Sequence, residues 1–126
     1  MQRKQTGALT GAAAAVVAIA VVNTPAAAAD AAHGKVVFQT CAACHSEKPD
    51  AIGPSLRGVY DRKSASLPDF RYSNAMRRAG LTWDDASLKA YIKDPQAKVK
   101  GNRMPFGGLG SEADIADLIA YLKEYK

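Results

Sequence analysis

A basic tract, an internal repeat and a strand-like pattern are all missing from residues 30–126. The formal net charge of the chain is +5, and it falls to about +3 without Arg3 and Lys4, which is too mild for a nucleic-acid-binding surface. No stretch alternates apolar and polar residues with the two-residue period of a half-buried strand. These absences exclude a nucleic-acid-binding protein and predict a single all-α domain, which is what 126 residues can accommodate.

The first 29 residues are predicted to be a secretory signal peptide. Two cations precede the uncharged stretch 7–22, and a proline-containing break is followed by Ala26-Ala27-Ala28-Ala29, which supplies small-residue cleavage sites. Cleavage after Ala29 leaves residues 30–126 as a mature domain in the periplasm, with no membrane span. The alternative is an uncleaved anchor, since about 16 apolar or small residues approach the roughly 20 that a spanning helix needs.

The only two cysteines lie close together, in the sequence Cys41-Ala42-Ala43-Cys44-His45. An exported protein with two cysteines ordinarily holds one disulfide, but a bridge across so short a loop adds little stability. Cys-x-x-Cys-His is the attachment signature of c-type haem, because both sulfurs share one face of a helical turn and the histidine is directed at the iron. The alternatives are a thioredoxin-type dithiol, which needs a βαβ setting, and a zinc site, for which two ligands are missing.

Three residues are candidates for the second iron ligand: His33, Met76 and Met104. Met104 lies in the glycine-rich loop 100–108, where core packing gives no reason for a methionine. Met76 lies in a short helix-like piece that ends at a glycine, where a methionine is more often a packing residue. His33 is too close in sequence to the attachment site to reach the opposite haem face, and we expect it to be a solvated helix residue. Met104 is therefore favoured, and imidazole–thioether ligation is typical of an electron carrier.

Three main helices are predicted. The first spans about 30–43, with Asp30 as its N-cap, and contains Gly34, which we expect to allow close approach of another helix. The second follows Ser111 and carries an apolar stripe, and the third begins at Thr82 as its cap and ends before Pro95. The residues available to the buried faces are Val36, Val37 and Phe38 in the first helix, Ile115, Leu118, Ile119 and Leu122 in the second, and Leu88, Tyr91 and Ile92 in the third.

Three short helices bury too little apolar surface to make a rigid domain of this size. We therefore expect the haem to complete the core. The stretch 53–70 is rich in glycine, proline and serine and has no periodicity, as expected of loops that wrap a planar cofactor.

The sequence matches one known family at many ordered points. These are Cys41 to His45, Gly53-Pro54-Ser55-Leu56, Arg62-Lys63, Phe70-Arg71-Tyr72-Ser73, Gly80-Leu81-Thr82-Trp83, Tyr91-Ile92-Lys93-Asp94-Pro95, Met104-Pro105-Phe106 and Asp117-Leu118-Ile119-Ala120-Tyr121-Leu122. The chain resembles class I cytochrome c, including the mitochondrial carrier and the bacterial cytochromes c2. The resemblance implies the cytochrome c fold, in which helices and loops surround one covalent haem, and a single-electron carrier that is not an enzyme.

The resemblance also implies roles around the haem. The Pro54 carbonyl accepts a hydrogen bond from His45, which fixes the imidazole tautomer, and Tyr91 approaches the Met104 sulfur. The other implied contacts are Arg62, Tyr72 and Trp83 with the haem propionates, and Phe106 over the exposed haem edge. For Trp83 and Tyr91 the alternative is simple aromatic packing, and for Arg62 it is a solvated cation.

Two departures from the mitochondrial pattern are expected to matter. Met76 stands where those carriers usually have asparagine, which predicts a less polar pocket near Met104. The lysine ring around the haem edge is thinner and keeps Lys98, Lys100 and Arg103, so electrostatic docking to an acidic partner should be weaker.

The sequence thus predicts a monomeric periplasmic electron carrier. Its partners would be membrane redox complexes, such as a cytochrome bc1 complex and a terminal oxidase or photosynthetic reaction centre. One alternative is a ligand-binding or weakly catalytic haem protein in which Met104 is labile. Another is a haem subunit that stays docked in a larger enzyme.

Overall fold

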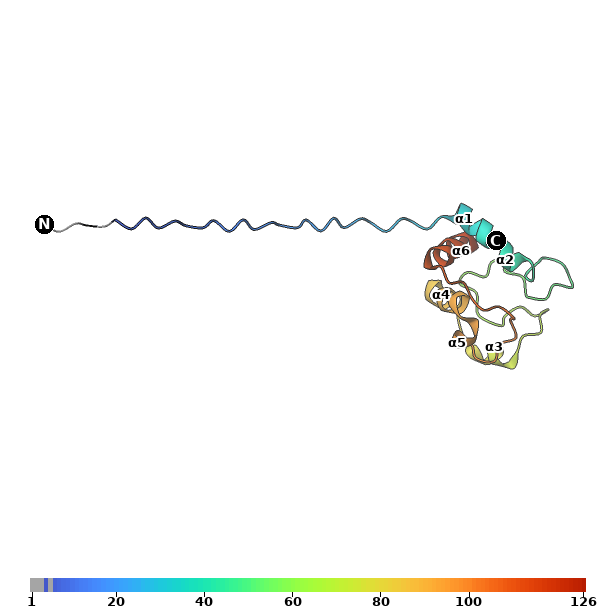
Figure 1. Cartoon of the computed structure of the whole chain (residues 1–126). Coiled ribbons are helices and arrows are strands. Elements are labelled where there is room, and N and C mark those ends of the chain that lie inside the picture. Colours follow the sequence, from blue (N-terminus) through green and yellow to red (C-terminus); the bar gives the residue numbers. More distant parts are fainter. Residues whose placement is uncertain (1–3, 5) are drawn as a thin grey trace.

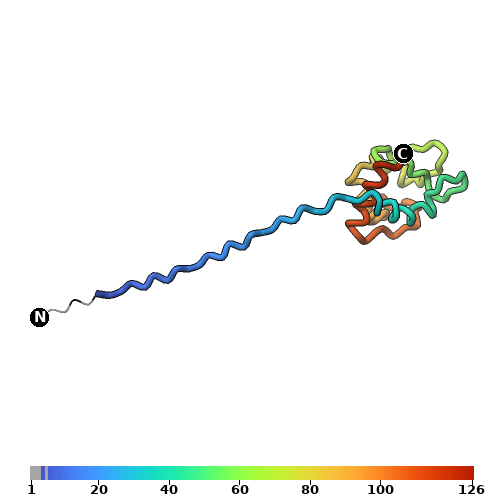
Figure 2. The backbone as a smooth tube through the Cα atoms, turned by 90° about the horizontal axis from the view of Figure 1, so that it is seen from above, coloured from blue at the N-terminus to red at the C-terminus, as the bar shows by residue number. Residues whose placement is uncertain are grey.

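The amino-terminal segment lies apart from the folded part of the chain. The computed structural model describes residue 4 and residues 6–126, so Arg3, one of the two predicted signal-peptide cations, lies outside the described residues. Residues 6–29 form no helix or strand and are exposed throughout, and Figures 1 and 2 show them as one extended segment that leads to the folded domain. No helix in the described part of the chain is long and apolar enough to cross a membrane. The signal peptide and its cleavage after Ala29 stay predictions.

The folded domain is all-α, as predicted. Its helices are α1 (Ala31–Val37), α2 (Gln39–Ala42), α3 (Asn74–Ala79), α4 (Asp85–Lys93), α5 (Pro95–Lys98) and α6 (Glu112–Glu124). Within residues 6–126 the extended pairing is limited to one isolated antiparallel bridge between Lys63 and Thr82. Helix α6 packs against both α1 and α4, and α4 also contacts α5; Figure 1 shows this arrangement.

The first predicted helix begins where expected but consists of two segments. The Asp30 side chain accepts hydrogen bonds from two backbone N–H groups of the first turn and so caps α1. The helix tightens at Phe38, whose carbonyl accepts from the N–H groups of both Cys41 and Ala42 at 2.9 Å. The prediction that Val36 is buried is wrong: it lies on the outer side and is 66% exposed, whereas Phe38 is buried.

The contact between α1 and α6 is very close, as Gly34 predicted. A Cβ atom at position 34 would overlap the backbone carbonyl of Asp117 and would lie 2.9 Å from the Cβ of Tyr121. The Phe38 ring packs nearby, with its centroid 5.1 Å and 5.0 Å from those of Tyr121 and Tyr125. The predicted apolar stripe of α6 is buried: Ile115, Leu118, Ile119 and Leu122.

The predicted N-cap of α4 is wrong by two residues. Asp84 is the cap, since its side chain accepts a hydrogen bond from the backbone N–H of Ser87, while Thr82 is held in the extended bridge to Lys63. The helix ends at Asp94 as predicted. Helix α5 was not predicted; it starts with Pro95 because Asp94 has an extended backbone and also caps α5.

Candidate haem-binding site

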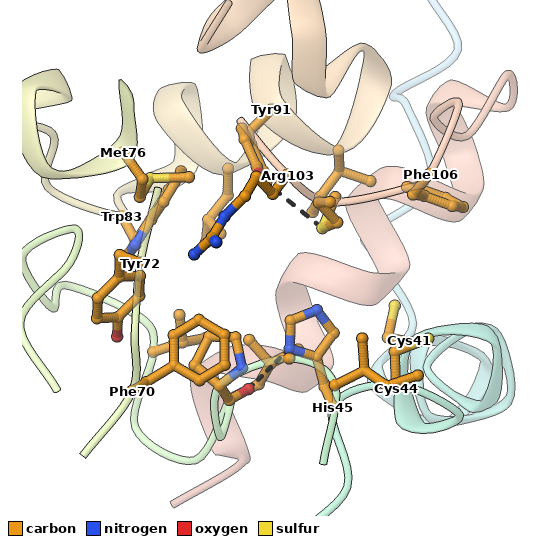
Figure 3. A pocket seen from close by; sticks show the side chains of 18 of the residues that line it. Cys41, Cys44, His45, Phe70, Tyr72, Met76, Trp83, Tyr91, Arg103 and Phe106 are labelled. Atoms are coloured by element: carbon orange, nitrogen blue, oxygen red, sulfur yellow. Dashed lines mark hydrogen bonds between the residues drawn. The ribbon is translucent and has the colours of Figure 1, made fainter. Parts of the chain in front are cut away.

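A cavity of about 700 Å³ lies among α2, α3, α4, α6 and the loops between them, within the range of about 300–1,000 Å³ typical of cofactor pockets. Figure 3 shows Cys41, Cys44 and His45 on one side of it, and Tyr91 and Phe106 across from them. The structure brings every predicted site residue to the wall of this cavity: Cys41, Cys44, His45, Pro54, Arg62, Tyr72, Trp83, Tyr91 and Met104. Met76 and Phe106 also line it.

The two cysteines are placed by α2 and the turn that follows it. The Cys41 carbonyl accepts hydrogen bonds from the N–H groups of Cys44 (3.1 Å) and His45 (2.9 Å), so the three side chains come from one helical turn. Both thiols are free and partly buried. Burial, together with the nearby Cys44, raises the pKa of the Cys41 thiol. A dithiol redox centre needs a lowered pKa on its nucleophilic cysteine, so this environment is unfavourable for thioredoxin-type exchange.

Zinc coordination requires more ligands than the cavity offers. Within the described residues, no three side chains of the types His, Cys, Asp and Glu come together in a way that could hold a metal ion.

The His45 imidazole is oriented so that one nitrogen faces the cavity. Its Nδ1 lies 2.7 Å from the Pro54 carbonyl oxygen, and because a carbonyl can only accept, Nδ1 carries a proton; in the neutral ring Nε2 then has a free lone pair. Burial lowers the pKa of His45, although the bond to Pro54 opposes this. Burial thus favours the neutral imidazole, the form that binds metals.

Gly53 makes room for this imidazole, and the sequence analysis gave it no such role. A Cβ at position 53 would lie 2.6 Å from both Cε1 and Nδ1 of His45. The Gly53 N–H also donates to the Cys44 carbonyl at 2.9 Å. The loop after His45 is thereby folded back onto the Cys-x-x-Cys turn, and this places the Pro54 carbonyl beside the ring.

The thioether of Met104 lies on the other side of the cavity. The Tyr91 hydroxyl is 3.8 Å from the Met104 sulfur, and Figure 3 shows Tyr91 across the cavity from His45. Burial raises the pKa of Tyr91 to about 12, so the hydroxyl keeps its proton and donates to the sulfur at any physiological pH. This is the contact that the family resemblance implied.

The Met104 loop is held by Asn102, which the sequence analysis did not single out. The Asn102 side chain is buried and donates to the carbonyls of Pro95 and Val99, both at 2.9 Å. Its Oδ1 accepts from the Met104 N–H at 2.8 Å. An asparagine two residues before the methionine was the available signal, but only the fold shows that this amide is inside the protein.

The remaining wall residues combine aromatic packing with a partly buried cation. Trp83 is 8% exposed, and its ring centroid lies 5.0 Å from that of Tyr91. The Arg62 guanidinium donates to the carbonyls of Ser55 and Arg57, each at 2.9 Å, and burial lowers its pKa. Arg62 is thus partly withdrawn from solvent, with a positive charge at the cavity wall. Tyr72 accepts from a backbone N–H at 3.3 Å.

His33 lies away from the cavity, in agreement with its exclusion as a ligand. It is half exposed, as predicted, but its Nδ1 lies 2.8 Å from Oδ2 of Asp117. The residues that do line the cavity fit a covalently bound haem: two adjacent thiols, a neutral imidazole with a free nitrogen, a thioether opposite it, and largely apolar walls.

Comparison with known proteins gives a consistent result. The family model described as cytochrome c matches residues 31–126. The chain is 44% identical to cytochrome c2 of Blastochloris viridis over 104 residues, which cover 80% of this chain and 82% of that protein. It is 49% identical to cytochrome c2 of Rhodoblastus acidophilus over 96 residues, covering 74% and 90%.

A solved structure shows the same fold. Cytochrome cH from Methylobacterium extorquens is 41% identical and superimposes with a TM-score of 0.72, covering 75% of this chain and 98% of that one. The chain therefore belongs to the cytochrome c family and is an electron carrier with covalently bound haem c, similar to the cytochromes c2 and not an enzyme.

Proposed function

We propose that this protein is a periplasmic carrier in which His45 and Met104 would hold the haem iron. The observation that carries the proposal is the pair of oriented donors on opposite sides of one cavity. The neutral His45 ring directs Nε2 inward because Pro54 holds Nδ1, and the Met104 sulfur is held by Tyr91. Bound haem iron supplies one-electron chemistry by changing between its ferrous and ferric states.

The protein's own contribution is to keep both donors in place in either oxidation state. Pro54 and Gly53 fix the imidazole, and Asn102 and Tyr91 fix the methionine. A ligand set that does not change between oxidation states keeps reorganisation small. If both donors bind the iron, they would leave no position for an external ligand, which favours electron transfer over ligand binding.

Membrane redox complexes are the proposed partners of the processed, monomeric protein. We propose that a cytochrome bc1 complex donates electrons and that a terminal oxidase or a photosynthetic reaction centre accepts them. The exposed cations Lys98, Lys100 and Arg103 lie just before or within the loop 100–108 that carries Met104, so they would steer an acidic partner toward this side of the cavity. The periplasmic location rests on the predicted signal peptide, residues 1–29.

The ligand assignment is tested with two methionine variants. Ferric holoprotein should show the weak near-red band of methionine-to-iron ligation. Met104→Ala should abolish this band, whereas Met76→Leu should keep it, because Met76 is a buried packing residue of α3. If Met104→Ala keeps the band, the assignment is wrong. Rapid binding of carbon monoxide by the reduced wild-type protein would instead support a ligand-binding function.

The docking proposal is tested by the salt dependence of the rate. The second-order rate constant for reduction by a purified bc1 complex should fall as ionic strength rises, since exposed charges are screened over about 10 Å at 0.1 M salt. A rate that does not depend on salt would exclude electrostatic steering and would favour apolar docking at Pro105 and Phe106.

A further inference from the structure

The boundary between the extended segment and the folded domain coincides with an unusual polar contact. The backbone nitrogen of Asp30 donates to Oδ1 of Asp117, a residue 87 positions later in α6, at 2.7 Å. The other carboxylate oxygen of Asp117 lies 2.8 Å from Nδ1 of His33. Each carboxylate oxygen of Asp117 thus has one partner, and the side chain is only 17% exposed.

The position of this nitrogen is fixed by backbone packing and not by flexible side chains. Gly34 brings α1 against the Asp117 carbonyl so closely that no Cβ fits between them. Asp30 is in addition the N-cap of α1, with its side chain bonded to the N–H groups of Ala32 and His33. A chain that began one residue later would lose this cap, and one that began earlier would present its terminal amine outside the contact.

The charges around this contact are unbalanced in the uncut chain. The carboxylates of Asp30, Asp114 and Asp117 face one titratable cation, His33, whose Nδ1 lies 3.9 Å from Asp114. The pKa of His33 is raised, chiefly by its hydrogen bond to Asp117. The Asp30 peptide N–H is a donor without charge. A further positive charge at this contact between α1 and α6 would therefore be stabilised by the excess of carboxylates.

The segment before Asp30 offers an accessible bond to cut. Residues 6–29 are exposed and lack secondary structure, and in Figure 2 they extend away from the domain up to the start of α1. Signal-peptide hydrolysis at the Ala29–Asp30 bond adds one water, which leaves a carboxylate on Ala29 and an amine on Asp30 that takes up a proton.

We propose that Asp117 is the acceptor for the new N-terminal ammonium of Asp30, so that processing converts a neutral hydrogen bond into an ion pair that fastens α1 to α6. The inference rests on the processing proposed above and adds what the new terminus binds. An opposite charge within hydrogen-bond distance stabilises the ammonium. The α-amino pKa in the folded protein should therefore exceed its ordinary value of about 7.7–8.0.

The sign of the pH effect follows directly. A group whose pKa is raised on folding stabilises the protein below its unfolded pKa and loses that contribution as the pH rises through its folded pKa. On alkaline titration the His33 contribution is lost first, above its ordinary value of about 6.5, and the α-ammonium contribution is lost above about pH 8.

The test uses the reduced, diamagnetic holoprotein purified from the periplasm. Intact mass should correspond to a chain that begins at Asp30. The α-amino pKa, followed by the carbonyl ¹³C shift of Asp30, should lie roughly 0.5 unit above the ordinary value. Asp117→Asn should return it to that value. Asp114→Asn, an equal charge change on the same helix, should lower it less, because no hydrogen bond joins Asp114 to the Asp30 nitrogen.

Three outcomes would overturn the inference: a different N-terminal residue, an unshifted α-amino pKa in the wild-type protein, or equal effects of the two variants. The wild-type titration decides the matter even if Asp117→Asn does not fold. Haem content, measured on the same samples as a pyridine haemochrome, reports on the carrier function separately, so failure of one proposal is distinguishable from failure of the other.

Discussion

Replacing Gly34 by alanine tests whether close contact between α1 and α6 is a main source of stability. The new methyl group would overlap the Asp117 carbonyl and approach the Tyr121 Cβ. A backbone carbonyl cannot rotate away as a side chain can, so α1 has to shift. That shift is opposed by Phe38, whose ring packs against both Tyr121 and Tyr125.

The expected loss of folding stability in Gly34→Ala follows from two opposing effects. Overpacking a well-packed contact costs about 1–3 kcal/mol, and a clash with backbone belongs at the upper end. Alanine gains roughly 0.5–1 kcal/mol over glycine within a helix. The net effect is a loss of about 2 kcal/mol, which corresponds to a fall in Tm of about 10 °C for a domain of this size.

Reversible guanidinium unfolding of the ferric holoprotein, followed by far-ultraviolet circular dichroism, measures this loss. Gly110→Ala is the matched control, because a Cβ at position 110 meets nothing within 4 Å and the backbone there is not left-handed; its stability should stay within about 0.5 kcal/mol of wild type. If Gly34→Ala unfolds at the same denaturant concentration as wild type, the close approach of the two helices contributes no measurable stability and the reasoning fails.

Three further variants probe the Met104 side and the surface. Asn102→Ala should cost about 1–3 kcal/mol, because the Met104 N–H loses its acceptor and the Pro95 and Val99 carbonyls each lose one of two donors, and should weaken the near-red band of the ferric spectrum. Tyr91→Phe removes the 3.8 Å hydroxyl contact to sulfur and should shift the reduction potential in a redox titration while changing stability by less than about 1 kcal/mol. Lys93 and Lys89 of α4 lower the pKa of Glu112 to about 2. The contribution of Glu112 to folding stability is therefore present above its unfolded pKa and is lost as the pH falls toward 2. Glu112→Gln should flatten the dependence of stability on pH over this range, measured by acid unfolding.

Local sequence signals predicted the ends of several helices because caps act within a few residues. Asp30 and Ser111 are caps in the structure. Thr82 was a wrong cap because a long-range bridge to Lys63 holds it extended, and the nearby Asp84 takes its place. Such a pairing joins residues 19 positions apart, so no short pattern could show it.

The two sides of the cavity differed in how far they could be predicted. Cys41 to His45 form one turn, and the carbonyl that orients His45 comes from Pro54 only nine residues later, so a motif and a family pattern were sufficient. The importance of Asn102 depends on the carbonyls of Pro95, the first residue of α5, and of Val99, its C-cap. Because α5 itself was missed, the burial of this amide could not be foreseen.

The contacts that hold the Met104 segment bear on the choice between an electron carrier and a ligand-binding protein. In the proposed ligand set, an external molecule could reach the iron only if Met104 left it, and the Met104 segment is fastened at both ends. On one side Asn102 holds the Met104 N–H. On the other, the Leu109 N–H donates to the Ile92 carbonyl at 3.0 Å, and Gly108 lies so close to the Lys93 carbonyl that a Cβ would overlap it. Moving the methionine therefore breaks contacts with both α4 and α5, and that cost favours a permanently saturated iron.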